Sequence, residues 1–382
     1  MKMLSKRLTR IEESATMKMG QIAKKLQAEG KSVLNFSLGE PDFKTPGHIC
    51  EAAKRALDLG YTHYVSSAGV DELREAIAEK IREENKVDVS AENVIVTPGA
   101  KQAIYELMMS VLDDGDEVIL LDPAWVTFES AVKLAGGNPK WVKRVEEEVN
   151  YASLESAVSE NTKLIVINSP NNPAGYVLSE KEQQEIAEFA VDHDLLVLSD
   201  EIYEKIIYGR KHVSIASFDG MQARTVIING FSKTYAMTGW RIGYAVAPTT
   251  EILKGMLKIQ QHSVSCAPSI AQSAALTALS SPQDCVNEMV EQFKRRRDVI
   301  VKRLSEIGLR CLNPEGAFYA FVNTSNYGND MELTERLLKE AYIVVTPGSA
   351  FGVAGKNYVR FSFAASMEDI LEGMERIEKM FS

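Results

Sequence analysis

A lysine and an arginine lie eight positions apart in one short segment, residues 232–241, with the sequence SKTYAMTGWR. The segment follows an apolar, strand-like run at residues 225–229. The amine of Lys233 can condense with an aldehyde, and the guanidinium of Arg241 can pair with a phosphate. The two side chains therefore suit a cofactor that carries both groups, and pyridoxal phosphate is such a cofactor.

Four further candidates also come directly after predicted strands. In open α/β sheets, ligands bind beyond the carboxyl ends of the strands. Taken alone, each candidate has a plain structural explanation, such as a helix cap, a core aromatic ring or a turn. Those explanations account poorly for all of them together, so we expect one shared site. The candidates are Asp200 after 195–199, Asn172 after 164–168, Trp125 after 117–121, and Gly99-Ala100-Lys101 after 94–97.

The elements that must position these residues follow an α/β pattern. The five runs named above and a sixth at residues 244–247 are short and apolar, as buried parallel strands are. Helical patterns alternate with them: residues 71–85 place apolar side chains on one face, and Ser179 with Glu182 forms a capping box that opens another helix.

The length of 382 residues predicts more than one domain. After about residue 280 the pattern changes to a long helix at 286–307, a turn-rich stretch and a strand at 317–322, and Ser366 caps a last amphipathic helix. We therefore expect a large domain at 46–280 and a small one at 281–382. Residues 1–45 are too short for a core of their own and must pack on another domain or subunit.

Composition argues against several classes of protein. The formal charge is −10, with 53 acidic and 43 basic residues, which disfavours nucleic acid and anionic membranes as partners. The basic cluster at 294–297 is interpreted as a solvated helix face. Four cysteines and five histidines show no metal-binding spacing, so no metal is expected. Without an export signal or a membrane-spanning run, we expect a cytoplasmic protein.

Four motifs resemble the class I aminotransferases of the pyridoxal-phosphate fold type I superfamily, over nearly the whole chain. In its sequence pattern, the chain is most similar to the prokaryotic branch that contains aspartate and aromatic aminotransferases. The resemblance implies an α/β fold with a large domain built on a mostly parallel seven-stranded sheet flanked by helices, a smaller α+β domain, and a homodimer whose partner contacts residues 1–45. The motifs are GEPDF at 39–43, SPNNPAG at 169–175, SDEIY at 199–203 and FSKTYAMTGWR at 231–241.

The resemblance also implies roles around the cofactor ring. Lys233 would form a Schiff base with the aldehyde and then shuttle a proton on the substrate. Asp200 would keep the pyridine nitrogen protonated, which makes the ring an electron sink. Asn172 and Tyr203 would bind the phenolic oxygen, and Trp125 would stack on the ring face.

The phosphate needs compensation for its charge. Backbone N–H groups of Gly99-Ala100-Lys101, at the start of a helix, would supply part of it, and Arg241 would add a charge-assisted contact. Tyr64 would reach the phosphate from the neighbouring subunit. Many relatives carry a hydroxyl residue three positions before the lysine, where this chain has Gly230, and Ser232 is a candidate to compensate.

Substrate recognition is expected at Arg360. The alternation in residues 358–363 points Arg360 to the side opposite its apolar neighbours. It matches the family's arginine for the substrate α-carboxylate, where the planar guanidinium makes two parallel hydrogen bonds. The main-chain N–H of Gly39 would assist, and Trp125 and Asn172 would line the substrate side as well.

Specificity is less well defined by the sequence. Some aspartate aminotransferases bind the second carboxylate with an arginine from the partner subunit, in the segment corresponding to 260–268, where this chain has no arginine. Gln261, His262, Ser14 and Thr16 are the candidates left. Substrates of aromatic, alanine or prephenate type therefore stay open.

We predict an aminotransferase of amino acid metabolism that runs a ping-pong cycle, with aspartate and 2-oxoglutarate as the first choice of substrates. An aromatic or broad-specificity aminotransferase is the alternative, and a β-lyase is more distant. A cofactor-binding domain of a transcription regulator is the alternative from another class, because one fold hosts many functions. The acidic charge argues against it.

Overall fold

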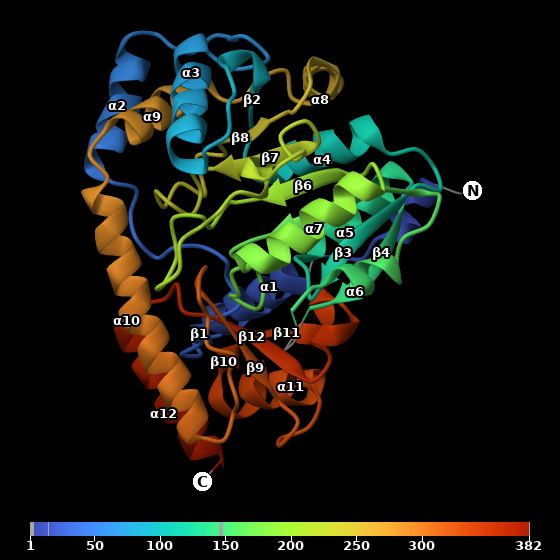
Figure 1. Ribbon diagram of the computed structural model, residues 1–382. Helices are drawn as coiled ribbons and strands as arrows, with labels where there is room; N and C mark the ends of the chain where they lie inside the picture. The colour runs from blue at the N-terminus through green and yellow to red at the C-terminus, as the bar shows by residue number, and fades with distance from the viewer. Residues whose placement is uncertain (1–3, 14, 145–147, 382) are drawn as a thin grey trace.

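The computed structural model describes residues 4–13, 15–144 and 148–381. Its centre is a seven-stranded sheet with the order β2-β8-β7-β6-β5-β3-β4 (Figure 1). Six of these strands are mutually parallel and β8 runs against them. The strands are β2 Val94–Thr97, β3 Glu117–Asp122, β4 Asn138–Lys143, β5 Thr162–Asn168, β6 Leu196–Asp200, β7 Thr225–Gly230 and β8 Gly243–Val246.

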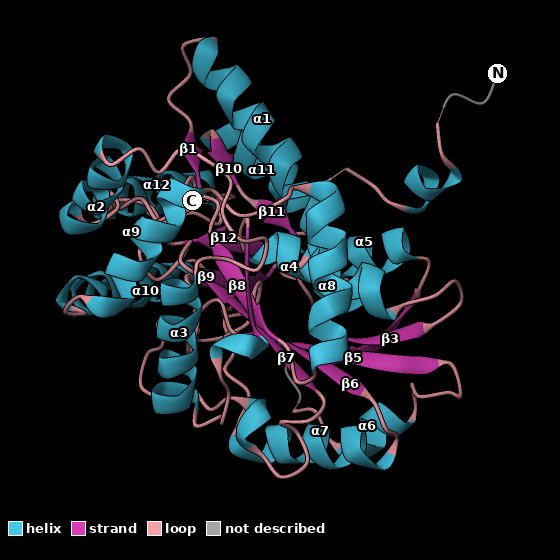
Figure 2. Ribbon diagram, turned by 90° about the horizontal axis from the view of Figure 1, so that it is seen from above, coloured by secondary structure: helices cyan, strands magenta, loops and turns pink. Residues whose placement is uncertain are grey.

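Helices cover both faces of this sheet, as Figure 2 shows. One apolar cluster joins one face to α4, α5 and α8. Two more clusters join the other face to α2, α3 and α9 and to α6 and α7. Because both faces are buried, the inner strands are apolar without interruption. The helices are α2 Gly47–Asp58, α3 Asp71–Lys80, α4 Ala100–Val111, α5 Val126–Ala135, α6 Tyr151–Glu155, α7 Glu180–Asp192, α8 Thr250–Ser263 and α9 Ser269–Ser280.

A second, three-stranded antiparallel sheet has the order β11-β12-β9. It shares an apolar core with the long helix α10 and with α11 and α12, and α10 and α12 run side by side in Figure 1. These elements are α10 Asp284–Glu306, β9 Tyr319–Asn323, α11 Asp330–Ala341, β11 Thr346–Pro347, β12 Tyr358–Ser362 and α12 Met367–Phe381.

The N-terminal segment packs on this second layer. Its strand β1, Leu34–Asn35, pairs in parallel with β10, Ile343–Val344. Helix α1, Ala15–Ala28, contributes Met19 and Ala23 to a small apolar cluster with Val344. The segment therefore joins elements encoded more than three hundred residues later, although the domain boundaries drawn from the sequence stay a prediction.

Short helical turns complete the described chain. They are η1 Lys6–Arg10, the π-helical turn η2 Ile81–Asn85, η3 Ala91–Asn93, η4 Ile215–Ser217, η5 Gly348–Phe351 and η6 Val353–Gly355. None of the helices in the described part of the chain combines the length and the apolar character needed to cross a membrane.

The predicted strands and helices are largely confirmed. All six predicted strands of the large sheet are present, and the capping box of α7 is made by Ser179 and Glu182. The seventh strand, β4, was not predicted, because this half-exposed edge strand has the mixed sequence NPKWVK.

The interpretation of residues 294–297 as a solvated helix face is wrong for two of its four residues. Lys294 and Arg295 are exposed, but Arg296 is buried and binds both carboxylate oxygens of Asp42, at 2.6 and 2.9 Å. Arg297 lies over the ring of Tyr208. Two of the basic side chains of α10 therefore hold the fold together.

Candidate active site

The predicted site residues meet at one edge of the large sheet. Parallel strands β3, β5, β6 and β7 end there, and Asp200 is the last residue of β6. Asn168, at the end of β5, ties the neighbouring turns together. Its side chain donates to the carbonyl of Asp200 at 3.0 Å and accepts from the N–H of Asn172 at 2.9 Å. Sequence reasoning did not single out Asn168.

Asp200 presents a buried carboxyl to this edge. Its side chain is 2% exposed, and Oδ1 accepts a hydrogen bond from the N–H of Ile202 at 3.1 Å. Burial raises the pKa of Asp200 to about 7, and Glu201 adds to the rise while Lys233 opposes it. A protonated ring nitrogen placed against this carboxyl would offset the cost of burying its charge, so the residue fits a pyridine ring.

Lys233 lies in the loop after β7. Its Nζ donates to the carbonyl oxygen of Gly39 at 2.6 Å. Burial lowers the pKa of Lys233 to about 8; the carboxylates of Glu40 and Asp200 oppose this shift. A buried amine that loses its proton near neutral pH is the form in which a lysine attacks an aldehyde.

An anion site lies at the N-terminus of α4. Gly99 has a φ of 87°, and a Cβ at this position would lie 2.4 Å from Nη2 of Arg241. The guanidinium is held by the carbonyls of Thr238 and Pro98, at 3.0 and 3.3 Å. The N–H groups of Ala100 and of the next residue begin the helix and have no acceptor within it, so the arrangement fits a phosphate.

Gly230 stands where many relatives carry a hydroxyl residue, and the structure gives a steric reason for the glycine. A Cβ on Gly230 would lie 3.0 Å from the Cα of Gly243, on the adjacent strand. Gly243 itself lies against the start of α4, because a Cβ there would be 2.5 Å from the nitrogen of Ala100. Ser232 is buried next to Lys233.

Arg360 is a buried cation on the other side of the site. It is 1% exposed, and its Nη atoms donate to Asn172 Oδ1 at 2.8 Å and to the carbonyl of Ser37 at 2.6 Å. The guanidinium lies over the rings of Tyr319 and Phe351. Burial lowers the pKa of Arg360, and its buried Nε has no hydrogen-bond partner within the part of the chain that the structure describes. Such a group fits a carboxylate ligand.

Tyr319 is a site residue that sequence reasoning missed. Its hydroxyl shares a hydrogen bond of 2.8 Å with that of Tyr203, and a Cβ on Gly39 would lie 2.5 Å from it. Strand β9 sets Phe321 opposite Arg360, so Tyr319, two residues away, lies on the same face. The alternation of side chains in the predicted strand 317–322 could have suggested which residues face the site. Choosing the correct face required the pairing of this strand with β12, which the sequence does not show.

Trp125 and Lys101 form one wall. Lys101 Nζ lies 4.9 Å from the centroid of the indole ring, which packs edge-on against Phe128. Burial and the neighbouring Arg241 lower the pKa of Lys101. Sequence reasoning used only the backbone of Lys101 and missed this cation.

Three other predicted residues are exposed on the surface of the chain. Tyr64 is 87% exposed, and Gln261 and His262 are exposed near the end of α8. Ser14 lies outside the described residues, and the side chain of Thr16 is not described either.

A partly buried amine, a buried carboxyl, a helix N-terminus beside an arginine and a buried arginine together fit an enzyme of the α/β class that acts on a carboxylate-bearing substrate. The family described as aminotransferase class I and II matches residues 31–377. The chain belongs to this family and is an aminotransferase with the mostly parallel α/β fold of its solved relatives.

Several known proteins are similar over their whole length. The aspartate aminotransferase of Pyrococcus abyssi is 46% identical, covering 99% of this chain and 98% of the relative. The aromatic-amino-acid aminotransferase 2 of Thermococcus litoralis is 43% identical, with the same coverage. The structure of the aspartate aminotransferase from Thermus thermophilus with maleate superposes with a TM-score of 0.95 at 40% identity, covering 100% of both chains.

Proposed function

We propose that this aminotransferase uses pyridoxal phosphate to transfer the amino group of L-aspartate to 2-oxoglutarate. The observation that carries the proposal is a pair of groups at neighbouring strand ends: the partly buried Lys233, with its pKa lowered to about 8, and the buried Asp200, with its pKa raised to about 7. When bound, the cofactor supplies an electron sink for the bonds of the substrate α-carbon.

The chain's own residues hold the cofactor and move the proton. Lys233 would hold the cofactor through its aldehyde, and its Nζ, once free, would move a proton between the substrate α-carbon and the C4′ carbon of the cofactor. Asp200 would keep the ring nitrogen protonated, and Trp125 would pack on the ring. The phenolic oxygen would be bound by Asn172 and Tyr203, and the phosphate by Gly99, Ala100, Lys101, Ser232, Arg241 and the partner's Tyr64.

Arg360 binds the substrate α-carboxylate. Its Nε, which has no partner among the described residues, and its position over Tyr319 leave the guanidinium able to bind a carboxylate, and the N–H of Gly39 would assist. Asn172, already bonded to Arg360, links this subsite to the cofactor ring. Substrate and cofactor are thereby oriented by one hydrogen-bonded set.

The second carboxylate of aspartate is assigned to Lys101. Its amine lies against Trp125, and no carboxylate contributes to its lowered pKa. Two relatives support a dicarboxylic substrate: the Pyrococcus abyssi protein is an aspartate aminotransferase, and the Thermus thermophilus one was solved with maleate. The Thermococcus litoralis relative keeps an aromatic substrate as the second candidate.

The proposal extends to assembly and kinetics. We expect a cytoplasmic homodimer with a large domain at 46–280, a small one at 281–382 and an N-terminal segment at 1–45 that reaches the partner. The cycle is ping-pong: the first keto acid leaves before the second binds. The fully exposed Tyr64 supports the dimer, because its predicted phosphate contact requires another subunit.

The test of the cofactor is spectroscopic. Purified protein loaded with pyridoxal phosphate is expected to show a visible band that bleaches on adding productive amino donors. Borohydride reduction and peptide mapping should place the label on Lys233, and Lys233→Ala should lose at least about 10³-fold in rate. A label on another side chain would overturn the proposal.

The test of the substrate compares kcat/KM for aspartate and phenylalanine in wild type and Lys101→Ser. The serine variant should lose about 10- to 100-fold with aspartate and change little with phenylalanine. Lys181→Ser, at an exposed lysine in the first turn of α7, is the matched control and should leave both values unchanged. Strong phenylalanine turnover beside negligible aspartate turnover in wild type would favour the aromatic candidate.

A further inference from the structure

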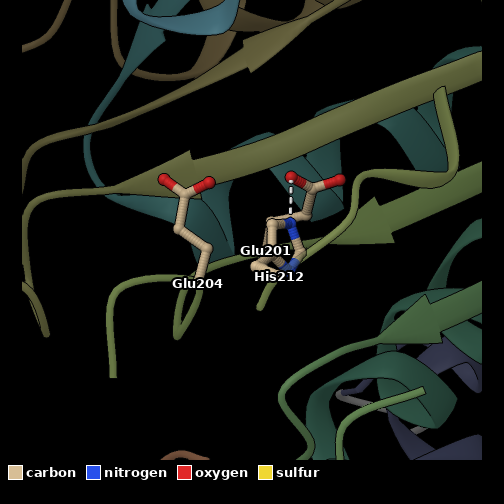
Figure 3. A group of neighbouring side chains, drawn as sticks. All are labelled: Glu201, Glu204 and His212. Carbon is tan, nitrogen blue, oxygen red and sulfur yellow. Dashed lines mark hydrogen bonds and ion pairs between the residues drawn. The ribbon is translucent and has the colours of Figure 1, made fainter. Parts of the chain in front are cut away.

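Next to Asp200 in the sequence begins a polar cluster of one buried and two partly buried side chains: Glu201, Glu204 and His212 (Figure 3). Their ligand-type atoms all lie within 4.8 Å of one another. Glu201 directly follows Asp200, and at the end of a strand successive side chains point to opposite sides. The cluster therefore lies on the side of the turn away from the Asp200 carboxyl.

The first role to weigh for such a cluster is metal binding, and the hydrogen bonds argue against it. Glu204 already contacts the ammonium group of Lys80, and its two oxygens also accept from Asn85 at 3.0 Å and Asn229 at 2.8 Å. The buried Lys80 occupies the place of a cation. The cluster is a protein-filled network.

Glu201 is saturated by four protein groups. Oε1 accepts from the hydroxyls of Ser199 at 3.0 Å and Ser214 at 2.6 Å. Oε2 accepts from Asn85 at 2.7 Å and lies 2.9 Å from Nε2 of His212. Since a carboxylate offers about four acceptor sites, each is used. The side chain is 1% exposed, so none of these bonds can be replaced by bulk water.

Glu204 extends the network to the turn that carries the lysine. Its Oε1 accepts from Asn229 Nδ2, and Asn229 Oδ1 accepts from the N–H of Gly230 at 2.7 Å. Gly230 ends β7, three residues before Lys233. One network therefore fixes both the turn after Asp200 and the turn before Lys233.

Opposite charges also meet in this network. Burial acts against the charged forms of Lys80 and His212, but nearby carboxylates raise the pKa of both groups overall, and Lys80 lowers the pKa of Glu204 to about 2. Glu84 approaches Lys80 from the outside at 3.4 Å. Buried networks whose hydrogen bonds are all made rigidify their surroundings.

We propose that Glu201 and Glu204 are positioning residues for transamination, which fix from behind the sheet the two turns that deliver the Asp200 carboxyl and the Lys233 amine. Catalytic groups need placement within about 0.5 Å, and a misplacement of about 1 Å costs about 10²-fold in rate. The inference rests on the proposed function, because it concerns the residues that hold the cofactor.

The test compares Glu201→Gln with Glu182→Gln. Glu182 is an equally buried glutamate that accepts from Ser179 and Val149 and pairs with Arg144, none of which is a site residue. An amide in place of Glu201 keeps at most one acceptor oxygen, so its turn should shift. We expect Glu201→Gln to raise the cofactor dissociation constant about tenfold or more and to lower kcat by a similar factor. The KM for the amino acid should stay within about twofold of the wild-type value, because Arg360 lies outside the network.

Glu182→Gln should lower the unfolding temperature of the cofactor-free protein without changing the cofactor dissociation constant or kcat. If Glu201→Gln does the same, the network is only structural and the proposal is overturned. Should Glu201→Gln fail to fold, two other variants carry the same comparison. Ser214→Ala removes one donor to Glu201, and Asn229→Ala removes the donor to Glu204 together with the acceptor of the Gly230 N–H. Failure of the proposed function is distinct, because wild-type protein would then not bind pyridoxal phosphate.

Discussion

At the scale of the residue, the buried carboxyl of Asp200 lowers the stability of the cofactor-free protein but suits the proposed transamination. Burial raises its pKa from an ordinary value of 3.8 to about 7. Between these pH values the folded protein binds more protons at this site than the unfolded chain. The contribution of Asp200 to stability therefore falls as the pH rises from about 4 to about 7.

Asp200→Asn should accordingly stabilise the cofactor-free protein at pH 8. The amide keeps the acceptor for the N–H of Ile202 and removes a buried charge, worth at most roughly 4 kcal/mol from about three pKa units. Thermal unfolding at pH 8 measures the change, and turnover of the loaded variant should be slow.

Glu117→Gln is a control for which the opposite change in unfolding temperature is expected. The Ser159 hydroxyl and Lys140 lower the pKa of Glu117, so its charge stabilises the fold above its ordinary range. This variant should unfold at a lower temperature at pH 8. A lower unfolding temperature for Asp200→Asn as well would contradict the account of its buried charge.

Individual site residues were predictable where a strand end fixed their place. Lys233, Asp200 and Asn172 each follow a continuous apolar run, and the parallel sheet brings such positions together. Tyr319 and Glu201 were not predictable as site residues, because their partners depend on strand register and on side chains far away in the sequence. Lys101 was assigned through its backbone alone, since its contact with Trp125 joins the first turn of α4 to the start of α5, which are separate in the sequence.

At the scale of the element, Arg296 fastens α10 to the loop that carries Gly39. It makes two hydrogen bonds to Asp42 and lies 4.7 Å from the centroid of the Phe43 ring. Thr45, further along the same loop, donates to the carbonyl of Ala236. The loop is thereby held between a helix of the C-terminal layer and the turn after Lys233.

Arg296→Lys should loosen this loop, because lysine cannot make the paired bonds of a guanidinium. We expect a 3- to 10-fold rise in the KM for the amino acid, about 1 kcal/mol or more of lost stability and a smaller change in kcat. Steady-state kinetics and denaturant unfolding measure these effects. Arg295→Lys, one residue away on an exposed face, should change neither; an unchanged KM in Arg296→Lys would sink the idea.

Elements were predictable in proportion to their burial. The inner strands are apolar throughout, and capping residues mark helix starts such as Ser179. Strand β4 escaped prediction because its side chains are half exposed, and α10 was assigned a solvated basic face because a helical pattern alone does not show which charged residues find partners on another segment.

At the scale of the whole molecule, the predicted dimer has a sharp consequence. If Tyr64 completes the partner's phosphate site, each active site draws on two chains. Protein carrying Tyr64→Ala should bind the cofactor more weakly, and protein carrying Lys233→Ala should be inactive. Neither kind of homodimer then has a complete site.

Mixing the two variants after unfolding should restore activity. Half of the random dimers are mixed, and each contains one site with both Lys233 and a partner Tyr64, so about a quarter of wild-type activity is expected at limiting cofactor. Analytical ultracentrifugation would measure the mass of the assembly and so show whether it is a dimer. Activity no greater than the sum of the separate variants would show that Tyr64 does not act across an interface.

The pairing of β1 with β10 has a consequence for synthesis on the ribosome. Leu34 and Asn35 emerge early, but their partners Ile343 and Val344 follow roughly 300 residues later. At a synthesis rate of about 10 residues per second, β1 can pair with β10 only some tens of seconds after β1 itself has been made. The nascent chain thus carries an unpaired strand until residues 343–344 have been made, so this pairing forms after all seven strands of the central sheet have been synthesised.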